Sequence, residues 1–188
     1  MALGPVEWES RVSVYRSDVD DMIVWFPDHR FIWSPDNFPV SRRGLEVETS
    51  VAFPLLGRVH SLRAHSAWSR VEHRGSVLSG QLAYRPRFTA DLQGNFDLSF
   101  GAATVHLGHV GTRRSVAGTG LNALDPYTLL DLGLELPFSA RFLQGQLQLH
   151  FSNLLDEKAA LLVDYPLPGR GWTTSVSFFA PSAKDLLP

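Results

Sequence analysis

Apolar and polar residues alternate with a period of two along most of this chain. Over residues 88–99, Phe, Ala, Leu and Gly occupy every second position, and Thr, Asp, Gln, Asn and Ser occupy the positions between them. Residues 44–53, 130–138 and 146–151 alternate in a similar way. A period of two is that of a β-strand and not of an α-helix. These segments are therefore predicted to be strands with one apolar face and one polar face.

The pattern predicts an all-β chain of about eight antiparallel strands, without a helix, a tandem repeat or a low-complexity linker. The expected strands lie near residues 8–26, 31–53, 59–73, 77–97, 101–112, 126–138, 145–154 and 171–179. Short connections are expected at 54–58, 98–100 and 139–144, and longer ones at 73–77, 113–125 and 155–170. Such alternation is typical of transmembrane β-barrels, which have tight periplasmic turns and long outer loops. The first connection, around residues 27–30, is short for an outer loop.

Alternation alone does not decide which face lies inside the fold. A soluble sandwich or small barrel buries its apolar rows, whereas a membrane barrel turns them to lipid and encloses a polar lumen. The polar rows here are poor in lysine and rich in uncharged residues such as Gln93, Asn95 and Gln148. Aromatic residues gather near predicted strand ends, as interfacial girdles do: Trp25, Phe26, Trp33, Phe53, Tyr127, Phe142 and Trp172. These features favour a membrane barrel and leave a soluble β domain as the alternative.

Composition narrows the classes of protein. Charged residues make up 19% of the chain, against about 25% in an ordinary soluble domain. No stretch approaches the roughly 18 consecutive apolar residues of a membrane helix. The net charge of -2 gives no reason to expect nucleic acid as a partner, and the absence of cysteine excludes disulfides and thiolate sites. Residues 1–9 lack the parts of a signal peptide, so we expect either a soluble chain or the downstream part of a longer protein.

Several short motifs follow one another in an order that resembles a known family. They are the strand Val14-Tyr15-Arg16-Ser17-Asp18, the segment Gly44-Leu45-Glu46, the pair Arg85-Pro86, the run Gly111-Thr112-Arg113, the run Asn153-Leu154-Leu155-Asp156, and Pro168-Gly169-Arg170 before a strand that ends on Phe178-Phe179. Over nearly the whole chain, they resemble the TonB-dependent outer-membrane receptors. The resemblance implies that residues 1–179 are the C-terminal portion of a transmembrane β-barrel and that residues 180–188 are a tail.

The resemblance also implies a function. Members of this family take up scarce nutrients such as ferric siderophores, haem, cobalamin or glycans across the bacterial outer membrane, with energy delivered by TonB. They have a plug domain inside a barrel of about 22 strands. No plug or TonB box is found here, so we expect a fragment, a truncated gene product or one part of a split barrel. The expected partners are membrane lipid, the remaining strands and plug, and TonB through that plug. A free-standing small barrel or a soluble β-sandwich that serves as a binding or structural module is the alternative.

The motif residues are expected to stabilise the fold rather than to touch a substrate. Asn153 would permit the turn into the last outer loop, Pro168 and Gly169 would bend the chain back, and Arg170 would anchor the final strand. Gly44 would remove a side chain where lumen residues crowd. Phe178 is expected on the lipid side, and either Phe178 or Phe179 would be the terminal signal. The complete set is Gly44, Glu46, Arg85, Pro86, Asn153, Asp156, Pro168, Gly169, Arg170, Phe178 and Phe179.

Sequence motifs of catalysis are absent. The chain has no phosphate-binding glycine loop, no His-Glu-x-x-His, no Gly-x-Ser-x-Gly and no EF-hand. We therefore predict that it is not an enzyme and that it has no cofactor. Arg113 and Arg114 open the longest outer loop and are the candidates for contact with an anionic ligand such as a siderophore.

Two groups of residues could in principle hold a metal ion or haem. Asp18, Asp20 and Asp21 offer carboxylate oxygens to a hard cation, although a solvated strand end is the commoner explanation. The second group is histidine: His106 and His150 are expected to face the lumen, and His109 lies on a nearby strand. A histidine that is simply hydrogen-bonded in the lumen is commoner than a metal ligand.

Overall fold

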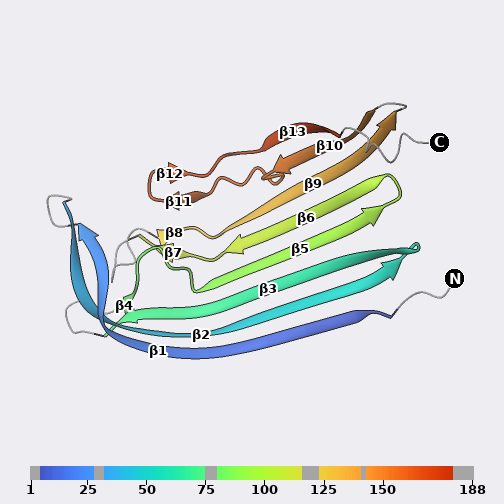
Figure 1. Ribbon diagram of the computed structural model, residues 1–188. Coiled ribbons are helices and arrows are strands. Elements are labelled where there is room, and N and C mark those ends of the chain that lie inside the picture. The colour runs from blue at the N-terminus through green and yellow to red at the C-terminus, as the bar shows by residue number, and fades with distance from the viewer. Residues whose placement is uncertain (1–4, 28–31, 75–79, 116–122, 141–142, 180–188) are drawn as a thin grey trace.

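Eight long strands form one antiparallel sheet in the computed structural model, which describes residues 5–27, 32–74, 80–115, 123–140 and 143–179 (Figure 1). The long strands are β1 (Glu7–Pro27), β2 (Trp33–Leu55), β3 (Arg58–His73), β5 (Phe88–Leu98), β6 (Gly101–Val110), β9 (Tyr127–Ala140), β10 (Leu143–Ser152) and β13 (Gly171–Phe179). The short strands are β4 (Gly80–Gln81), β7 (Arg113–Arg114), β8 (Ala123–Leu124), β11 (Ala160–Leu162) and β12 (Tyr165–Pro166). None of the described residues belongs to a helix long and apolar enough to cross a membrane. The prediction of an all-β, antiparallel chain is confirmed.

The long strands follow one another in the sheet in the order in which they occur in the chain, β1-β2-β3-β5-β6-β9-β10-β13. They make a single curved layer (Figure 1). The edges are β1 and β13, which do not pair with each other, so the described sheet is not closed. The free-standing closed barrel that the sequence left open is therefore not formed by these residues.

The connections alternate in length and separate the sheet into two ends (Figure 1). At the short-turn end, β2 turns into β3 through Leu56 and Gly57, whose φ angles of 53° and 77° are both left-handed. Such angles at both central residues belong to the tight turns that match strand twist. At the long-loop end, the longer connections run from β3 to β5, from β6 to β9 and from β10 to β13, and β4 pairs with the end of β3 within the first of them. This alternation agrees with the prediction from sequence.

The hairpin of β1 and β2 explains why the first connection is so short. These strands have 21 and 23 residues, and at about 3.3 Å per residue they reach about 70 Å. That length is more than twice the roughly 30 Å of a hydrocarbon core. The register shifts between Val19 and Met22, and such a bulge bends a strand. The hairpin thus curves past the other strands at the long-loop end (Figure 1). Because β1 and β2 themselves project at this end, the connection between them can be short.

One predicted strand was wrong. The sequence predicted a single strand over 77–97, whereas β5 begins only at Phe88, and β4 before it has two residues. Tyr84 has a φ of 58° and Pro86 has no N–H to donate, so the intervening segment cannot continue a ladder. The backbone N–H of Tyr84 instead donates to the carbonyl of Arg114 (2.6 Å) in the neighbouring loop. The two short hairpins within the long loops, β7 with β8 and β11 with β12, were not predicted.

Candidate functional site

Cross-strand register brings the apolar positions of the long strands to one face, which we call the apolar face. One row crosses the whole sheet through Trp8, Val51, Leu62, Gly94, Val105, Leu132, Phe151 and Trp172. No protein layer covers this row, since Trp8 and Trp172 at its ends are 72% and 74% exposed. The buried hydrophobic residues of the described chain are Val40, Leu82 and Ala159, all near the long-loop end. A soluble sandwich would bury the apolar face against a second sheet, and the described residues provide none.

Aromatic side chains stand at both ends of the apolar face. Towards the long-loop end they are Trp68, Phe88, Phe151 and Trp172, and towards the short-turn end they are Trp8, Phe53, Phe96, Phe138 and Phe178. Two girdles on the lipid side of a barrel have this arrangement. The sequence placed part of this set wrongly: Trp25 and Trp33 belong to the projecting hairpin, and Tyr127 lies on the polar face. Phe142 and the side chain of Phe26 lie outside the described residues.

The opposite face is polar, and its central residues interact with one another. The ring of His106 lies between two carboxylates: its Nε2 contacts Asp91, and its Nδ1 is 3.8 Å from Oδ2 of Asp131. His150 shares this face, whereas His109 lies on the apolar face, where its Nδ1 is 2.9 Å from the Thr128 hydroxyl. Among the described residues, no group of three or more side chains is arranged to hold a metal ion. The polar face therefore has a histidine in contact with carboxylates at its centre, as the polar wall of a wet lumen does.

The outer part of β1, at the long-loop end, carries three aspartates beyond its apolar-face residues: Asp18, Asp20 and Asp21. Arginines pair with two of them: Arg16 Nε is 3.4 Å from Asp18, and Arg74 is 2.5 Å from Asp20. A hydrogen bond from Ser41 is the main cause that lowers the pKa of the Asp18 carboxyl, and Arg16 and Arg74 add to it. The carboxyl is therefore ionised and paired, which fits the ion-paired strand end better than a cation site.

Asn153 holds the base of the last long loop. Its side chain is 4% exposed in a region where the chain leaves the ladder. The side-chain amide donates to the carbonyls of Glu157 (3.0 Å) and Pro168 (3.2 Å) and accepts from the Glu157 N–H (2.9 Å). Its own backbone N–H donates to Asp131 on β9 (2.8 Å). Asn153 also has a left-handed φ of 49°, which asparagine tolerates better than most residues. One residue thus joins both ends of the loop to the neighbouring strand.

Asp156 completes this base from the same motif. Its Oδ1 accepts the backbone N–H of Arg170 (3.2 Å), and a Cβ on Gly169 would lie 3.6 Å from the same atom. The residues that the sequence singled out, Asn153 with Asp156 and Pro168 with Gly169 and Arg170, therefore meet across the loop. Side chains provide the acceptors and donors that these backbone groups need outside a ladder.

Arg113 is buried, although the sequence predicted it as a ligand contact. It is 3% exposed, and its guanidinium donates to the carbonyls of Ala160 and Leu161 on β11, each at 2.9 Å. The guanidinium also lies 5.0 Å from the centre of the Tyr127 ring. Arg113 therefore fastens the hairpin β11–β12 to the neighbouring loop. Arg114, the next residue, is half-buried. Contact of these arginines with an anionic ligand stays a prediction.

Gly44 lies on the polar face opposite Tyr15. A Cβ there would stand 2.5 Å from the Tyr15 hydroxyl oxygen and 2.7 Å from the carbonyl oxygen of Trp68, so a larger residue would displace the tyrosine. Arg42 donates to the same hydroxyl (3.1 Å), with its guanidinium carbon 4.6 Å from the ring centre. Glu46 follows on the same face, opposite Ser13. Arg85 and Pro86 lie in the segment just before β5.

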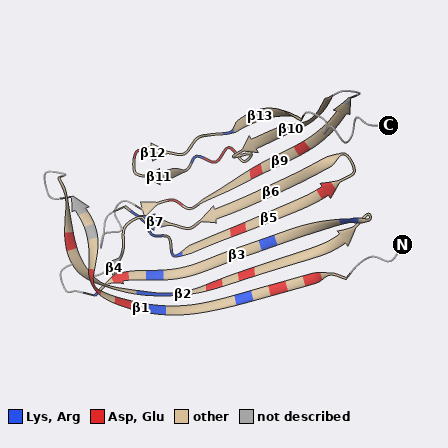
Figure 2. Cartoon of the chain, viewed as in Figure 1, with Lys and Arg blue, Asp and Glu red and all other residues tan. Residues whose placement is uncertain are grey.

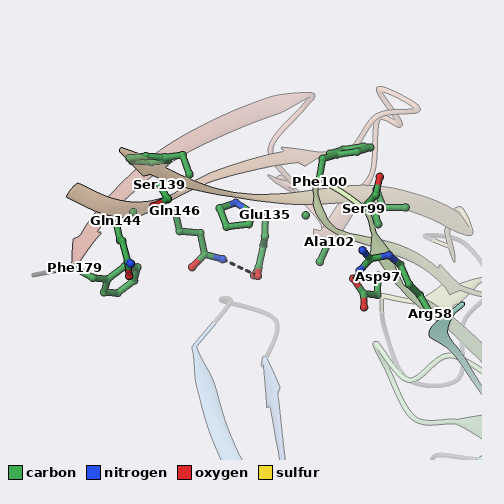
Figure 3. Close-up of a pocket in the computed structure, with 15 residues that line it drawn as sticks. Arg58, Asp97, Ser99, Phe100, Ala102, Glu135, Ser139, Gln144, Gln146 and Phe179 are labelled. Carbon is green, nitrogen blue, oxygen red and sulfur yellow. Dashed lines mark hydrogen bonds and ion pairs between the residues drawn. The ribbon is translucent and has the colours of Figure 1, made fainter. Parts of the chain in front are cut away.

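The last strand sends its two terminal phenylalanines to opposite faces. Phe178 packs edge-on against Phe138 on the apolar face, with ring centres 6.0 Å apart, and Gly145 of β10 lies between them in register. Phe179 lines a shallow hollow of about 710 Å³ near the short-turn end. Gln146 and Glu135 are hydrogen-bonded in this hollow (2.9 Å), as Figure 3 shows. Residues 180–188, the predicted tail, lie outside the described residues.

The family follows from a comparison with known proteins. Residues 6–154 match the model of the TonB dependent receptor-like β-barrel. The chain belongs to this family. Among solved structures, it is similar to the closed form of Fiu, the ferric-catecholate import receptor of Escherichia coli K12, with a TM-score of 0.61 and 16% sequence identity. The match covers 92% of this chain and 25% of the Fiu chain, so the chain spans about a quarter of that receptor. No curated protein matches.

Membership in the TonB-dependent receptor family gives the two ends of the sheet their orientation. Transmembrane barrels have short periplasmic turns and longer extracellular loops. In a barrel of this family, the short-turn end would face the periplasm, and the long-loop end, with Asn153 and Arg113, would face outwards. The family also implies the outer membrane as the location, and its members are transporters. The sequence prediction of this family is confirmed.

Proposed function

We propose that this chain forms part of the wall of an outer-membrane receptor that imports a scarce nutrient with energy from TonB. The observation that carries the proposal is the continuous apolar face, which crosses all eight long strands and has no protein layer over it. Lipid is the solvent in which such a face is stable. The family match over residues 6–154 supports transport rather than catalysis.

The edges of the sheet indicate which partners are needed. The outer sides of β1 and β13 have no ladder partner among the described strands. Unpaired backbone groups in hydrocarbon cost several kcal/mol each, so an open sheet is not tolerated there. We infer that further barrel strands pair with both edges. The polar face would then enclose a lumen that a plug domain fills, and TonB would act through that plug.

The ligand belongs to the same proposal. A siderophore, cobalamin or another scarce nutrient would enter at the long-loop end. The similar receptor Fiu is described as a ferric-catecholate importer, and ferric catecholates are anionic. Arg114 lies at this end and would be the first candidate to meet such an anion, because the bonds of Arg113 are directed to carbonyls of β11.

The membrane part of the proposal is tested by gel migration. The assembled barrel that contains this chain is extracted in detergent and run with and without boiling. Folded membrane barrels resist the detergent of the gel, so we expect a faster band before boiling and a slower one after it. A monodisperse protein that stays soluble without detergent would contradict this part of the proposal.

The transport part is tested by uptake. Cells whose own siderophore receptors have been deleted would express the receptor that contains this chain, with and without an intact TonB. Radiolabelled ferric catecholate, ferric hydroxamate and cobalamin are supplied separately. Uptake of one probe that disappears without TonB is expected. If no probe enters, or if entry is equal without TonB, energy-coupled import of these nutrients is wrong.

A further inference from the structure

Three arginines stand side by side on neighbouring strands. Arg16 of β1 is the register partner of Arg43 of β2, and Arg43 is the partner of Arg70 of β3. Figure 2 shows basic bands at the same level on these strands, near the long-loop end. Like charges directly opposite one another destabilise a sheet. Anions bound beside these arginines would therefore stabilise the sheet.

This arginine row adjoins the lipid-facing surface. Each arginine follows, two positions further along its strand towards the long-loop end, a residue of the apolar face: Val14, Leu45 and Trp68. Because side chains alternate with a period of two, the arginines point to the same side as those residues. The row thus lies where the apolar band ends on the outer side, at the level of lipid headgroups.

The charges of the row are only partly balanced by the protein. Arg16 has Asp18 (3.4 Å) and Arg70 has Glu72 (2.6 Å) as partners on their own strands. The corresponding neighbour of Arg43 is Ser41, which has no charge. Within the described residues, no carboxylate lies within 4.0 Å of the Arg43 guanidinium. Arg74, the next cation on that side, is engaged with Asp20. The central arginine is exposed and is left with its charge uncompensated.

We propose that Arg43, flanked by Arg16 and Arg70, binds the phosphate of a lipid headgroup in the outer leaflet. The guanidinium matches phosphate oxygens with two parallel hydrogen bonds. A lipid phosphate fits better than a free one, because acyl chains of the same molecule would lie on Val14, Leu45 and Trp68. The inference rests on the proposed membrane function and adds a binding site to it.

Co-purification with lipid A, a phosphorylated glycolipid, tests the site. The assembled barrel would be incubated in detergent with lipid A, and bound lipid would be counted by native mass spectrometry. Arg43→Gln is expected to weaken binding about tenfold, as loss of one charged hydrogen-bonded contact does. Arg42→Gln is the matched control: it removes the same charge from the adjacent residue, whose side chain lies on the polar face with Tyr15. This control should bind lipid A like the unmodified barrel.

The outcomes distinguish failure of this lipid site from failure of the proposed membrane function. Equal binding by Arg43→Gln and the unmodified barrel would overturn the site, and so would an equal loss in Arg42→Gln. Displacement of lipid A by an equimolar amount of inorganic phosphate would show a free-anion site instead and would also overturn the lipid proposal. Heat-modifiable migration is recorded for every variant. If the unmodified barrel migrates normally but binds no lipid A, only this inference is wrong; if the unmodified barrel shows no heat-modifiable migration, the membrane function itself fails.

Discussion

The two ends of the sheet reverse the chain by different means. At the short-turn end, Leu56 and Gly57 suffice, because their left-handed φ angles let one strand return directly into the next. At the long-loop end, buried polar side chains hold the connections. Asn153 and Arg113 are 4% and 3% exposed and donate to backbone carbonyls of loop segments.

The difference shows what a long loop requires. Every residue that leaves a ladder brings a backbone donor and acceptor that need new partners. A two-residue turn leaves few such groups, and water reaches them. A loop such as 153–170 packs against its neighbours, so a buried amide or guanidinium has to supply the missing bonds. Side chains should therefore matter more to stability at the long-loop end than at the short-turn end.

The largest effect is expected at Asn153. Asn153→Ala leaves three hydrogen-bonding backbone groups without their partner and should lower the free energy of unfolding by about 3 kcal/mol. Asn153→Gly separates the causes, because glycine adopts the φ of 49° without strain and should be about 1 kcal/mol less destabilising than alanine. Urea unfolding of the assembled barrel in detergent measures both. Unfolding of the alanine variant at the same urea concentration as the unmodified barrel would contradict the role of this residue.

A smaller effect is expected at Arg113. Arg113→Gln removes the bonds to Ala160 and Leu161 and should cost about 2 kcal/mol. The β11–β12 hairpin should then be cleaved faster in limited proteolysis. Arg114→Gln is the control, since this half-buried neighbour carries the same charge and should change stability by no more than about 0.5 kcal/mol. Equal cleavage of the two variants would show that Arg113 does not fasten the hairpin.

Gly145 tests packing within the regular sheet. A Cβ at this position would overlap the Phe138 ring and stand 2.6 Å from the Ser177 carbonyl oxygen, so Gly145→Ala should cost about 1–2 kcal/mol. Gly133→Ala is the matched control on the opposite face, where the nearest atom, Thr104 Cβ, is 3.7 Å away. The midpoint of urea unfolding should fall only for Gly145→Ala. Equal midpoints would mean that the phenylalanine pair moves aside without a loss of stability.

The smallest effect is expected at the short-turn end. Arg58 and Asp97 form an ion pair of 3.0 Å between side chains that are 39% and 55% exposed. Such a pair contributes about 0.5 kcal/mol, because water and salt screen it. Arg58→Ala should thus leave the unfolding midpoint nearly unchanged. A loss as large as that of Asn153→Ala would erase the proposed difference between the two ends.

The sequence predicted the regular part of the sheet because the polarity of each strand residue matches the environment of the face on which it lies. Alternation over 88–98 and 130–138 involves residues that are neighbours in the chain, so it can be seen in the sequence alone. The segment before β5 was predicted wrongly because the left-handed Tyr84 interrupts the ladder without a signal in the alternation. Pro86 was the available signal, since it cannot donate to a ladder.

The outer end was predictable in part. The motif around Asn153 was recognised, but its bond to Pro168 depends on how the loop returns. The bonds of Arg113 to backbone carbonyls were not predicted, because a charge in a loop gives no indication that carbonyls surround it. The arginine row was missed, although a signal existed: Arg16, Arg43 and Arg70 each stand two positions beyond an apolar-face residue. Only the register showed that these positions are adjacent.

If the apolar face meets lipid and the polar face does not, labels on the two faces will be quenched differently by lipid. The chain has no cysteine, so Leu132→Cys and Glu135→Cys on β9 each place one fluorophore within it. Quenching by spin-labelled lipid is then measured in vesicles that hold the assembled barrel. We expect strong quenching at 132 and little at 135. Equal quenching at both positions, or stronger quenching at 135, would contradict the claim.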